Sequence, residues 1–134
     1  WWEDSLVDPD NRRPVDFGRS TEHPKTRLVQ EALRARAAHP DAFGVAGTYQ
    51  RLTADGPAAD RTIAFVRGTH DTPSVVVVTA RFTHSLDHDA AAATSIALPT
   101  GFRWRDDRTG SVYEGSVDLA SARAEHPVAI LVRT

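Results

Sequence analysis

The sequence predicts a mainly β fold, an antiparallel β-sandwich preceded by one α-helix. Three observations support this prediction. From Gly47 onward, short apolar segments are separated by turn residues such as Gly, Pro and Asp. One segment, Val75–Val78, is apolar on both faces, which is typical of a central strand. The segments follow one another at short, regular spacing, which favours an antiparallel sandwich over βαβ units.

The N-terminal segment, residues 1–24, has no regular apolar period and is rich in Asp, Asn and Pro from Asp8 to Pro14. These residue types favour turns, through side-chain hydrogen bonds to the backbone and through the fixed φ of proline. We therefore expect a structured loop that cannot form a core alone and must pack on another part of the protein.

A helix is predicted from Lys25 to Ala38, because apolar residues recur there with a period of about 3.6. Ser20 or Thr21 can supply the N-cap, and Pro24 suits the first turn. Pro40 ends the helix, since it lacks a backbone N–H and disfavours α geometry in the residue before it. The expected buried stripe comprises Leu28, Val29, Ala32 and Leu33, with the stem of Arg36 at its edge.

Strands are predicted between the turn signals that follow this helix. Their ranges are Thr48–Leu52, Arg61–Arg67, Ser74–Phe82, Ser95–Leu98, Phe102–Arg105, Ser111–Tyr113 and Val128–Arg133. Gly56-Pro57 and the segment from Pro99 to Gly101 are among the turn signals that separate them.

The composition excludes several classes of protein. Sixteen Lys and Arg against 18 Asp and Glu give a net charge of −2, unlike a strongly basic nucleic-acid-binding domain. The chain has no cysteine, which excludes disulfides and Cys-based zinc sites. No apolar run approaches the roughly 20 residues of a membrane span, so we expect no membrane partner. The chain also lacks methionine, and we expect it to be part of a larger protein.

A polar segment brings His84, Asp87, His88 and Asp89 close together in sequence. Imidazole and carboxylate groups are metal ligands, so this segment could hold a metal ion. It lies between predicted strands and lacks a helical stripe, and we prefer to interpret it as a solvated polar loop.

Other charged and imidazole groups suggest no catalytic role. Asp106 and Asp107 stand between Arg105 and Arg108, a pattern that we interpret as a solvated hairpin. His39 and His126 each precede a proline and are interpreted as residues at the boundaries of elements.

The N-terminal loop has the highest density of polar groups, because Asp8, Asp10 and Asp16 surround Arg12 and Arg13. Paired carboxylates can act as acid and base on a glycosidic bond, but ion pairing with the two arginines is the simpler role. In acidic metal-binding loops the ligands occupy alternate positions, as Asp8 and Asp10 do here. Such loops also contain a glycine that allows a sharp bend, and that glycine is missing from this segment. The sequence shows no nucleophile elbow, phosphate-binding glycine loop or dinucleotide motif. We therefore expect function in this loop.

From Ser5 to Asp16 the chain reads Ser-Leu-Val-Asp-Pro-Asp-Asn-Arg-Arg-Pro-Val-Asp. This ordered stretch closely resembles one segment of the maltooligosyltrehalose synthase family, which belongs to the α-amylase clan. Weaker similarity continues through Leu33–Phe43, Gly56–Gly68, Trp104–Gly110 and His126–Leu131. The resemblance covers the whole chain, although the stretch between Phe17 and Lys25 is shorter than expected for this family.

The resemblance implies an isomerase of trehalose biosynthesis, a cytoplasmic enzyme of carbohydrate metabolism without metal or organic cofactor. Such an enzyme converts the reducing-end α-1,4 bond of a maltooligosaccharide to an α,α-1,1 bond by intramolecular transglucosylation with retention. Retention requires two carboxyl groups about 5 Å apart. The family carries them on barrel strands upstream of the present motif, so we expect no catalytic residue in this chain and no activity from it alone.

The same resemblance implies a division of the chain. Residues 1–46 would form the last loop and helix of a catalytic (β/α)8 barrel, or TIM barrel, and residues 47–134 a C-terminal β-sandwich domain. Loops at that face of a barrel build the active site. The residues expected to bind substrate are Asp8, Asp10, Asn11, Arg12 and Arg13, although the two arginines could instead only pin the loop through ion pairs. The expected partners are the maltooligosaccharide and the rest of the chain's own barrel.

A stand-alone sugar-binding or scaffolding β-sandwich module is the alternative hypothesis. It rests on Trp1, Trp2 and Trp104, because the flat face of an indole can stack on a sugar ring. Packing in a core or an interface is the commoner position of a Trp side chain.

Overall fold

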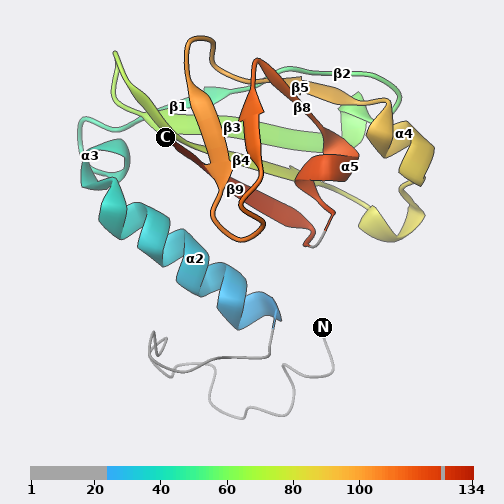
Figure 1. The fold of residues 1–134 in the computed structure, drawn as a ribbon, viewed down its shortest axis with the longest axis horizontal. Helices are drawn as coiled ribbons and strands as arrows, with labels where there is room; N and C mark the ends of the chain where they lie inside the picture. Colours follow the sequence, from blue (N-terminus) through green and yellow to red (C-terminus); the bar gives the residue numbers. More distant parts are fainter. Residues whose placement is uncertain (1–23, 125) are drawn as a thin grey trace.

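The computed structural model describes residues 24–124 and 126–134. They form a nine-stranded antiparallel sheet with the order β1-β3-β4-β9-β6-β7-β8-β5-β2 (Figure 1). The strands are β1 (Thr48–Arg51), β2 (Ala54–Asp55), β3 (Thr62–Gly68), β4 (Pro73–Ala80), β5 (Ser95–Ala97), β6 (Arg103–Asp106), β7 (Val112–Glu114), β8 (Ser116–Asp118) and β9 (Val128–Arg133). The helices are α2 (Pro24–Ala38), α3 (Pro40–Phe43), α4 (His88–Ala92) and α5 (Leu119–Ala122). The predicted mainly β fold is confirmed.

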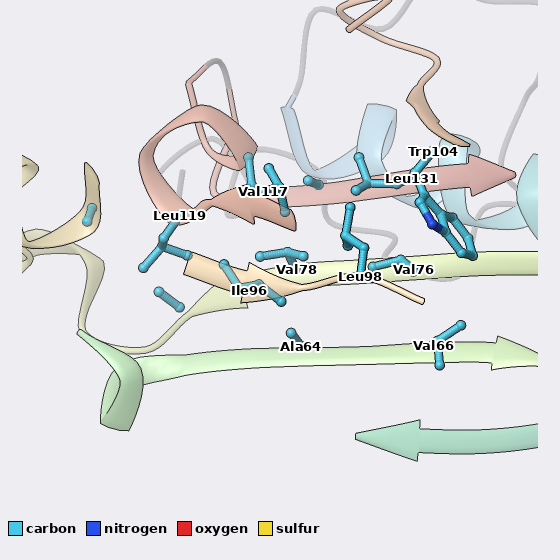
Figure 2. Close-up of a cluster of buried hydrophobic side chains, with 14 of the residues drawn as sticks. Ala64, Val66, Val76, Val78, Ile96, Leu98, Trp104, Val117, Leu119 and Leu131 are labelled. Carbon is cyan, nitrogen blue, oxygen red and sulfur yellow. The ribbon is translucent and has the colours of Figure 1, made fainter. Parts of the chain in front are cut away.

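The sheet folds back on itself, so that its two halves face each other across one apolar core. The chain turns from β7 to β8 at Gly115, whose φ of 73° is in the left-handed region that favours glycine. One half contributes Ala64, Val66, Val76, Val78, Trp104, Ala129 and Leu131 to the core, and the other half contributes Ile96 and Val117. Figure 2 shows Ile96 and Val117 gathered with Val76 and Val78 in this cluster. The arrangement is the expected sandwich, built from one continuous ladder of strands.

Strand β4 is an interior strand, as the apolar run Val75–Val78 predicted. It pairs with β3 on one side and β9 on the other. Val76 and Val78 point into the core and are fully buried, while Val75 on the opposite face is 1% exposed. Helix α3 contacts β3 and β4, so this end of the outer face is covered as well. Burial on both faces explains why the sequence of β4 does not alternate between apolar and polar residues.

Each of the predicted strands has a counterpart in the structure, with differences at the ends. The strand predicted to reach Phe82 ends at Ala80, because Phe82 has a φ of 53° and leads into a 3-10 turn at Thr83–Ser85. The sequence analysis missed β2, β8 and the short helices α3, α4 and α5. These elements contain only two to five residues. A segment of that length is too short to show a period.

Helix α2 ends at Ala38 as predicted and begins at Pro24, one residue before the predicted start, but the predicted buried stripe is wrong. Val29 and Leu33 are 37% and 36% exposed, and Ala32 and Arg36 are exposed too. The buried side chains of the helix are Gln30 and Ala35, and Leu28 and Glu31 are half-buried. The helix residues that line the junction with the sheet are charged or small, namely Arg27, Glu31, Arg34, Ala35 and Ala38.

Arg67 attaches helix α3 to the outer face of the sheet. Its Nε and Nη2 atoms donate to the carbonyl oxygen of Ala42 at 3.2 and 3.1 Å. Its guanidinium carbon also lies 5.2 Å from the centre of the Phe43 ring, in cation–π geometry. Ala42 itself is 1% exposed. Pro40 thus ends α2 as predicted and at the same time begins α3, since proline suits the first turn of a helix.

Thr94 connects helix α4 to the loop before β3. Its side chain is fully buried. The hydroxyl donates to the carbonyl of Ala90 at 2.7 Å and accepts from the backbone N–H of Ala58 at 2.9 Å. Gly56 lies so close that an added Cβ would stand 2.4 Å from the carbonyl oxygen of Ala93. The loop before β3 therefore fits tightly against the end of α4.

We expect Leu131→Ala to lower the free energy of unfolding by about 2–5 kcal/mol, because it leaves a cavity in the core. Leu131 is fully buried between the two halves of the sheet. Val45→Ala is the matched control, since Val45 is fully exposed and its truncation should change stability by no more than about 0.5 kcal/mol. Urea unfolding followed by circular dichroism measures both. Equal losses in the two variants would contradict the proposed position of the core.

We expect Thr94→Val to cost about 1–3 kcal/mol, although it preserves the shape of the side chain. The methyl group that replaces the hydroxyl leaves the buried N–H of Ala58 without its acceptor. Thr100→Val is the control, because Thr100 is exposed. The same urea titration measures the difference, and a Thr94→Val variant as stable as the control would show that this hydrogen bond is not needed.

Candidate functional site

The residues predicted to bind substrate, Asp8, Asp10, Asn11, Arg12 and Arg13, lie outside the described residues. The same holds for Trp1 and Trp2 and for the proposed N-caps of the first helix, Ser20 and Thr21. These assignments remain predictions. What the structure describes is the element that follows them in the chain, helix α2, and the part of the sheet on which that helix lies.

The segment around His84 is a set of exposed side chains, as the preferred interpretation held. Asp87 has a local structural role, because its Oδ1 atom accepts from the backbone N–H of Ala90 at 3.0 Å and caps helix α4. His88 and Asp89 occupy the first turn of this short helix, which the sequence analysis had taken for a loop. The part of the chain that the structure describes contains no group of three His, Cys, Asp or Glu side chains that could hold a metal ion.

Trp104 is a core residue and offers no surface to a sugar. Its side chain is fully buried within the central apolar cluster. The Phe102 ring meets it edge-on at 6.4 Å between ring centres, and its Nε1 atom lies 3.4 Å from the carbonyl oxygen of Pro99. This position removes the one described residue on which the sugar-stacking hypothesis rested.

The acidic hairpin between β6 and β7 is only partly solvated, which corrects the sequence-based interpretation. Arg105 and Asp107 form an exposed ion pair of 2.7 Å, as expected. Asp106, in contrast, is 4% exposed, and the side chain of Arg108 is 6% exposed. The neighbouring sequence could not reveal this burial, because the groups that cover Arg108 belong to distant parts of the chain.

A cleft of about 480 Å³ separates helix α2 from this hairpin and from β9. Arg27, Glu31 and Arg34 line it from the helix, and Arg105, Asp107 and Arg108 line it from the hairpin. Ala35, Ile130 and Val132 form apolar parts of its wall. The mixed charges of its lining distinguish it from the pockets with only a few polar groups that enclose small ligands. The contacts within it serve to hold the helix on the sheet.

Arg108 makes the central contacts of this junction. Its Nη2 atom donates to the carbonyl oxygen of Val128 at 2.9 Å, at the start of β9. Its Nε atom lies 3.6 Å from Oε2 of Glu31 on α2. Glu31 also pairs with Arg27, one helical turn away, at 3.4 Å. A buried guanidinium needs an opposite charge nearby, and Glu31 supplies it.

The turn of the hairpin fixes the backbone of Arg108. Oδ1 of Asp106 accepts from the Arg108 N–H at 2.9 Å, and the Asp106 carbonyl accepts from the N–H of Gly110 at 2.8 Å. Gly110 has a φ of 75°, which favours glycine at this position. The Asp-Asp-Arg-Thr-Gly sequence is a turn signal. It therefore predicts the hairpin, but not the partner of its arginine.

No family model matches this chain. A protein of Mycobacterium tuberculosis named as maltooligosyl trehalose synthase is 41% identical over an alignment of 138 residues, in each of two strains. The alignment covers 98% of this chain and 17% of the relative. No helix in the described part of the chain is long and apolar enough to cross a membrane.

Two solved structures of maltooligosyltrehalose synthase from Arthrobacter ramosus, one of them a point variant, match this fold. The TM-scores are 0.69 for one and 0.70 for the variant, each with 31% identity. Each match covers 95% of this chain and 18% of the solved chain. The chain thus spans less than a fifth of the length of the relatives that it matches. Sequence and structure together relate this chain, along almost its whole length, to the C-terminal portion of the maltooligosyltrehalose synthases.

Proposed function

We propose that this chain acts as the C-terminal portion of a maltooligosyltrehalose synthase. The observation that carries the proposal is the match over 98% of the chain at 41% identity, joined to the structural match at a TM-score of 0.70. In the intact enzyme the reaction is the isomerisation of the reducing-end α-1,4 bond of a maltooligosaccharide to an α,α-1,1 bond. We place the enzyme in the cytoplasm, without a metal or organic cofactor.

The chemistry of this reaction needs groups that the proposal assigns to other parts of the enzyme. A retaining transglucosylation requires a nucleophilic carboxylate and a proton-transferring carboxyl group about 5 Å apart. Among the described residues, Asp106 is the one buried carboxylate, and its Oδ1 atom is occupied by the Arg108 N–H. The hydrogen bond from the Arg108 N–H suits the Asp106 carboxylate to a structural role in the turn between β6 and β7. The catalytic pair would therefore lie in the larger part of the synthase that this chain does not match.

The N-terminal segment would supply contacts to the sugar. Asp8, Asp10, Asn11, Arg12 and Arg13 carry donors and acceptors that suit the hydroxyl groups of a glucan, and arginine offers several donors in a fixed planar fork. An arginine can also keep a neighbouring catalytic carboxylate ionised through its positive charge. In this proposal the segment lies in the last loop of the catalytic barrel.

The division at residue 46 would separate barrel from sandwich. Helix α2 belongs to the first part, and its outward face supports this assignment. Val29 and Leu33 lie about one turn apart on that face and are 37% and 36% exposed. Two apolar side chains on one side of a helix suit contact with further polypeptide. We propose the rest of the catalytic barrel as this contact and residues 47–134 as the separate sandwich domain.

We expect the isolated 134-residue chain to produce no non-reducing sugar from maltopentaose, because it lacks the catalytic pair in this proposal. The intact synthase that carries the chain, assayed in parallel by the loss of reducing ends, is the positive control. Turnover by the isolated chain would place the catalytic groups within it and overturn this part of the proposal.

In the intact synthase we expect Arg12→Ala and Arg13→Ala each to lower kcat/KM by about tenfold or more, since a hydrogen bond to a charged group contributes about 1.5–3 kcal/mol. The unfolding temperature should change little, because the lost contacts are to substrate. Arg51→Ala on the edge strand β1 is the control and should keep full activity, because Arg51 is exposed. If both variants kept full activity, Arg12 and Arg13 would have only a structural role.

A further inference from the structure

A second cleft, of about 540 Å³, lies between the edge strand β1, the hairpin that joins β3 to β4, and the loop that leads into β6. Its volume is within the range of about 300–1,000 Å³ that is typical of small-molecule sites. Strands β3 and β4 have seven and eight residues, whereas β5 and β8 in the other half of the sheet have three each. The inner face of the longer half reaches the surface at this cleft, where Gln50 is exposed.

The lining of this cleft contains no Lys, Arg, Asp or Glu, within the part of the chain that the structure describes. Such residues make up 25% of the sequence, and several of them line the cleft beside α2. A phosphate or carboxylate ligand would therefore find no lysine or arginine to bind it here. The polar side chains are hydroxyl, amide and imidazole groups, which suit a neutral ligand with hydroxyl groups. They belong to Thr48, Tyr49, Gln50, Thr69, His70 and Thr100.

Gln50 reaches the cleft from β1. It pairs with Val66 of β3, and residues directly opposite each other on neighbouring strands share one face of the sheet. Val66 belongs to the apolar core, so Gln50 lies on the inner face and lines the cleft. The side chains of Gln50, Thr69 and Thr100 form no hydrogen bond with another described residue. Their amide and hydroxyl groups can donate to a ligand and accept from it.

Phe102 supplies the flat apolar surface of the cleft. Its ring is half-buried and packs on the core. The buried Trp104 meets it edge-on, and the guanidinium carbon of Arg133 lies 5.4 Å from its centre. These contacts hold the ring in place, while part of it stays exposed in the cleft. A sugar ring has C–H groups on its faces and hydroxyl groups around its edge, so it can contact a flat apolar ring and polar groups at once.

The walls of the cleft are held in place by contacts within the chain. The hydroxyl of Thr48 is within hydrogen-bonding distance of the carbonyl oxygens of Gly68 and Thr69, at 3.2 and 3.3 Å. The N–H of Thr69 donates to the carbonyl of Thr72 at 2.9 Å across the hairpin turn. Strand β1 and the hairpin are therefore joined at the cleft. A wall that is already formed loses little conformational freedom when a ligand binds.

We propose that this cleft is a non-catalytic binding site for a neutral sugar. Phe102 is the apolar contact, and Gln50, Thr69 and Thr100 are the hydrogen-bonding groups. The lining determines the class of ligand, and the choice of an α-1,4 glucan among neutral sugars rests on the function proposed above. In the intact synthase, a second point of attachment raises the local concentration of substrate chains at the enzyme.

The test follows the amide NMR signals of the 134-residue chain during addition of maltotriose. Concentrations up to about 20 mM cover millimolar dissociation constants. We expect shifts in residues 48–50, 68–70 and 99–102, which surround the cleft. Gln50→Ala, Thr100→Val and Phe102→Leu should each weaken binding by about three- to tenfold, since each removes a hydrogen bond or the flat ring.

Arg51→Ala is the matched control, because Arg51 follows Gln50 on β1 and is also exposed. Successive side chains of a strand point to opposite faces, so this variant should bind maltotriose within about twofold of the wild type. Inorganic phosphate at the same concentrations should leave the signals of the cleft unchanged. Shifts with phosphate as large as those with maltotriose would indicate an anion site and overturn the proposal.

Three other results would overturn the sugar site. They are no shift in the cleft residues at the highest maltotriose concentration, shifts confined to residues 1–23, and wild-type affinity in all three cleft variants. The assay of the intact synthase on maltopentaose keeps this proposal apart from the proposed function. An inactive synthase would refute the proposed function, whereas an active synthase without shifts in the cleft refutes the sugar site alone.

Discussion

The burial of one apolar core between the two halves of a folded sheet is the constraint on which the rest of this structure depends. Val76, Val78 and Leu131 from one half meet Ile96 and Val117 from the other, and all five are almost completely buried. Neither half could bury these side chains alone, because a single sheet leaves one face in water. Closing the sheet over this core fixes the strand β6 and therefore the hairpin that follows it.

Helices α2 and α3 meet the sheet through polar contacts as well, whereas α4 and α5 contribute Ala91, Leu119 and Ala122 to the apolar core. Arg67 binds the Ala42 carbonyl of α3, and Arg108 binds Glu31 of α2, so two arginines of the sheet hold the helical segment at two points. The hydrogen bonds of Arg67 are directional, whereas apolar burial is not. The helix can in this way keep a defined orientation with little apolar contact to the sheet, and its residues Val29 and Leu33 remain available on the opposite side.

The chain corresponds to less than a fifth of the synthases that it matches, and its described residues form a scaffold with a charged junction. The polar residues with the strongest family resemblance, from Asp8 to Arg13, are separated from the start of α2 by residues 14–23.

The sequence by itself determined seven of the nine strands, the interior position of Val75–Val78, the end of the helix at Pro40 and the family resemblance of Ser5–Asp16. Local patterning suffices for these features, because periodicity, turn residues and motifs are properties of neighbouring residues. Only the tertiary structure decided which face of α2 is buried and that Arg108 lies beneath it. An apolar stripe indicates that a helix has a preferred face, but a buried charge on the surface that it meets can outweigh that preference.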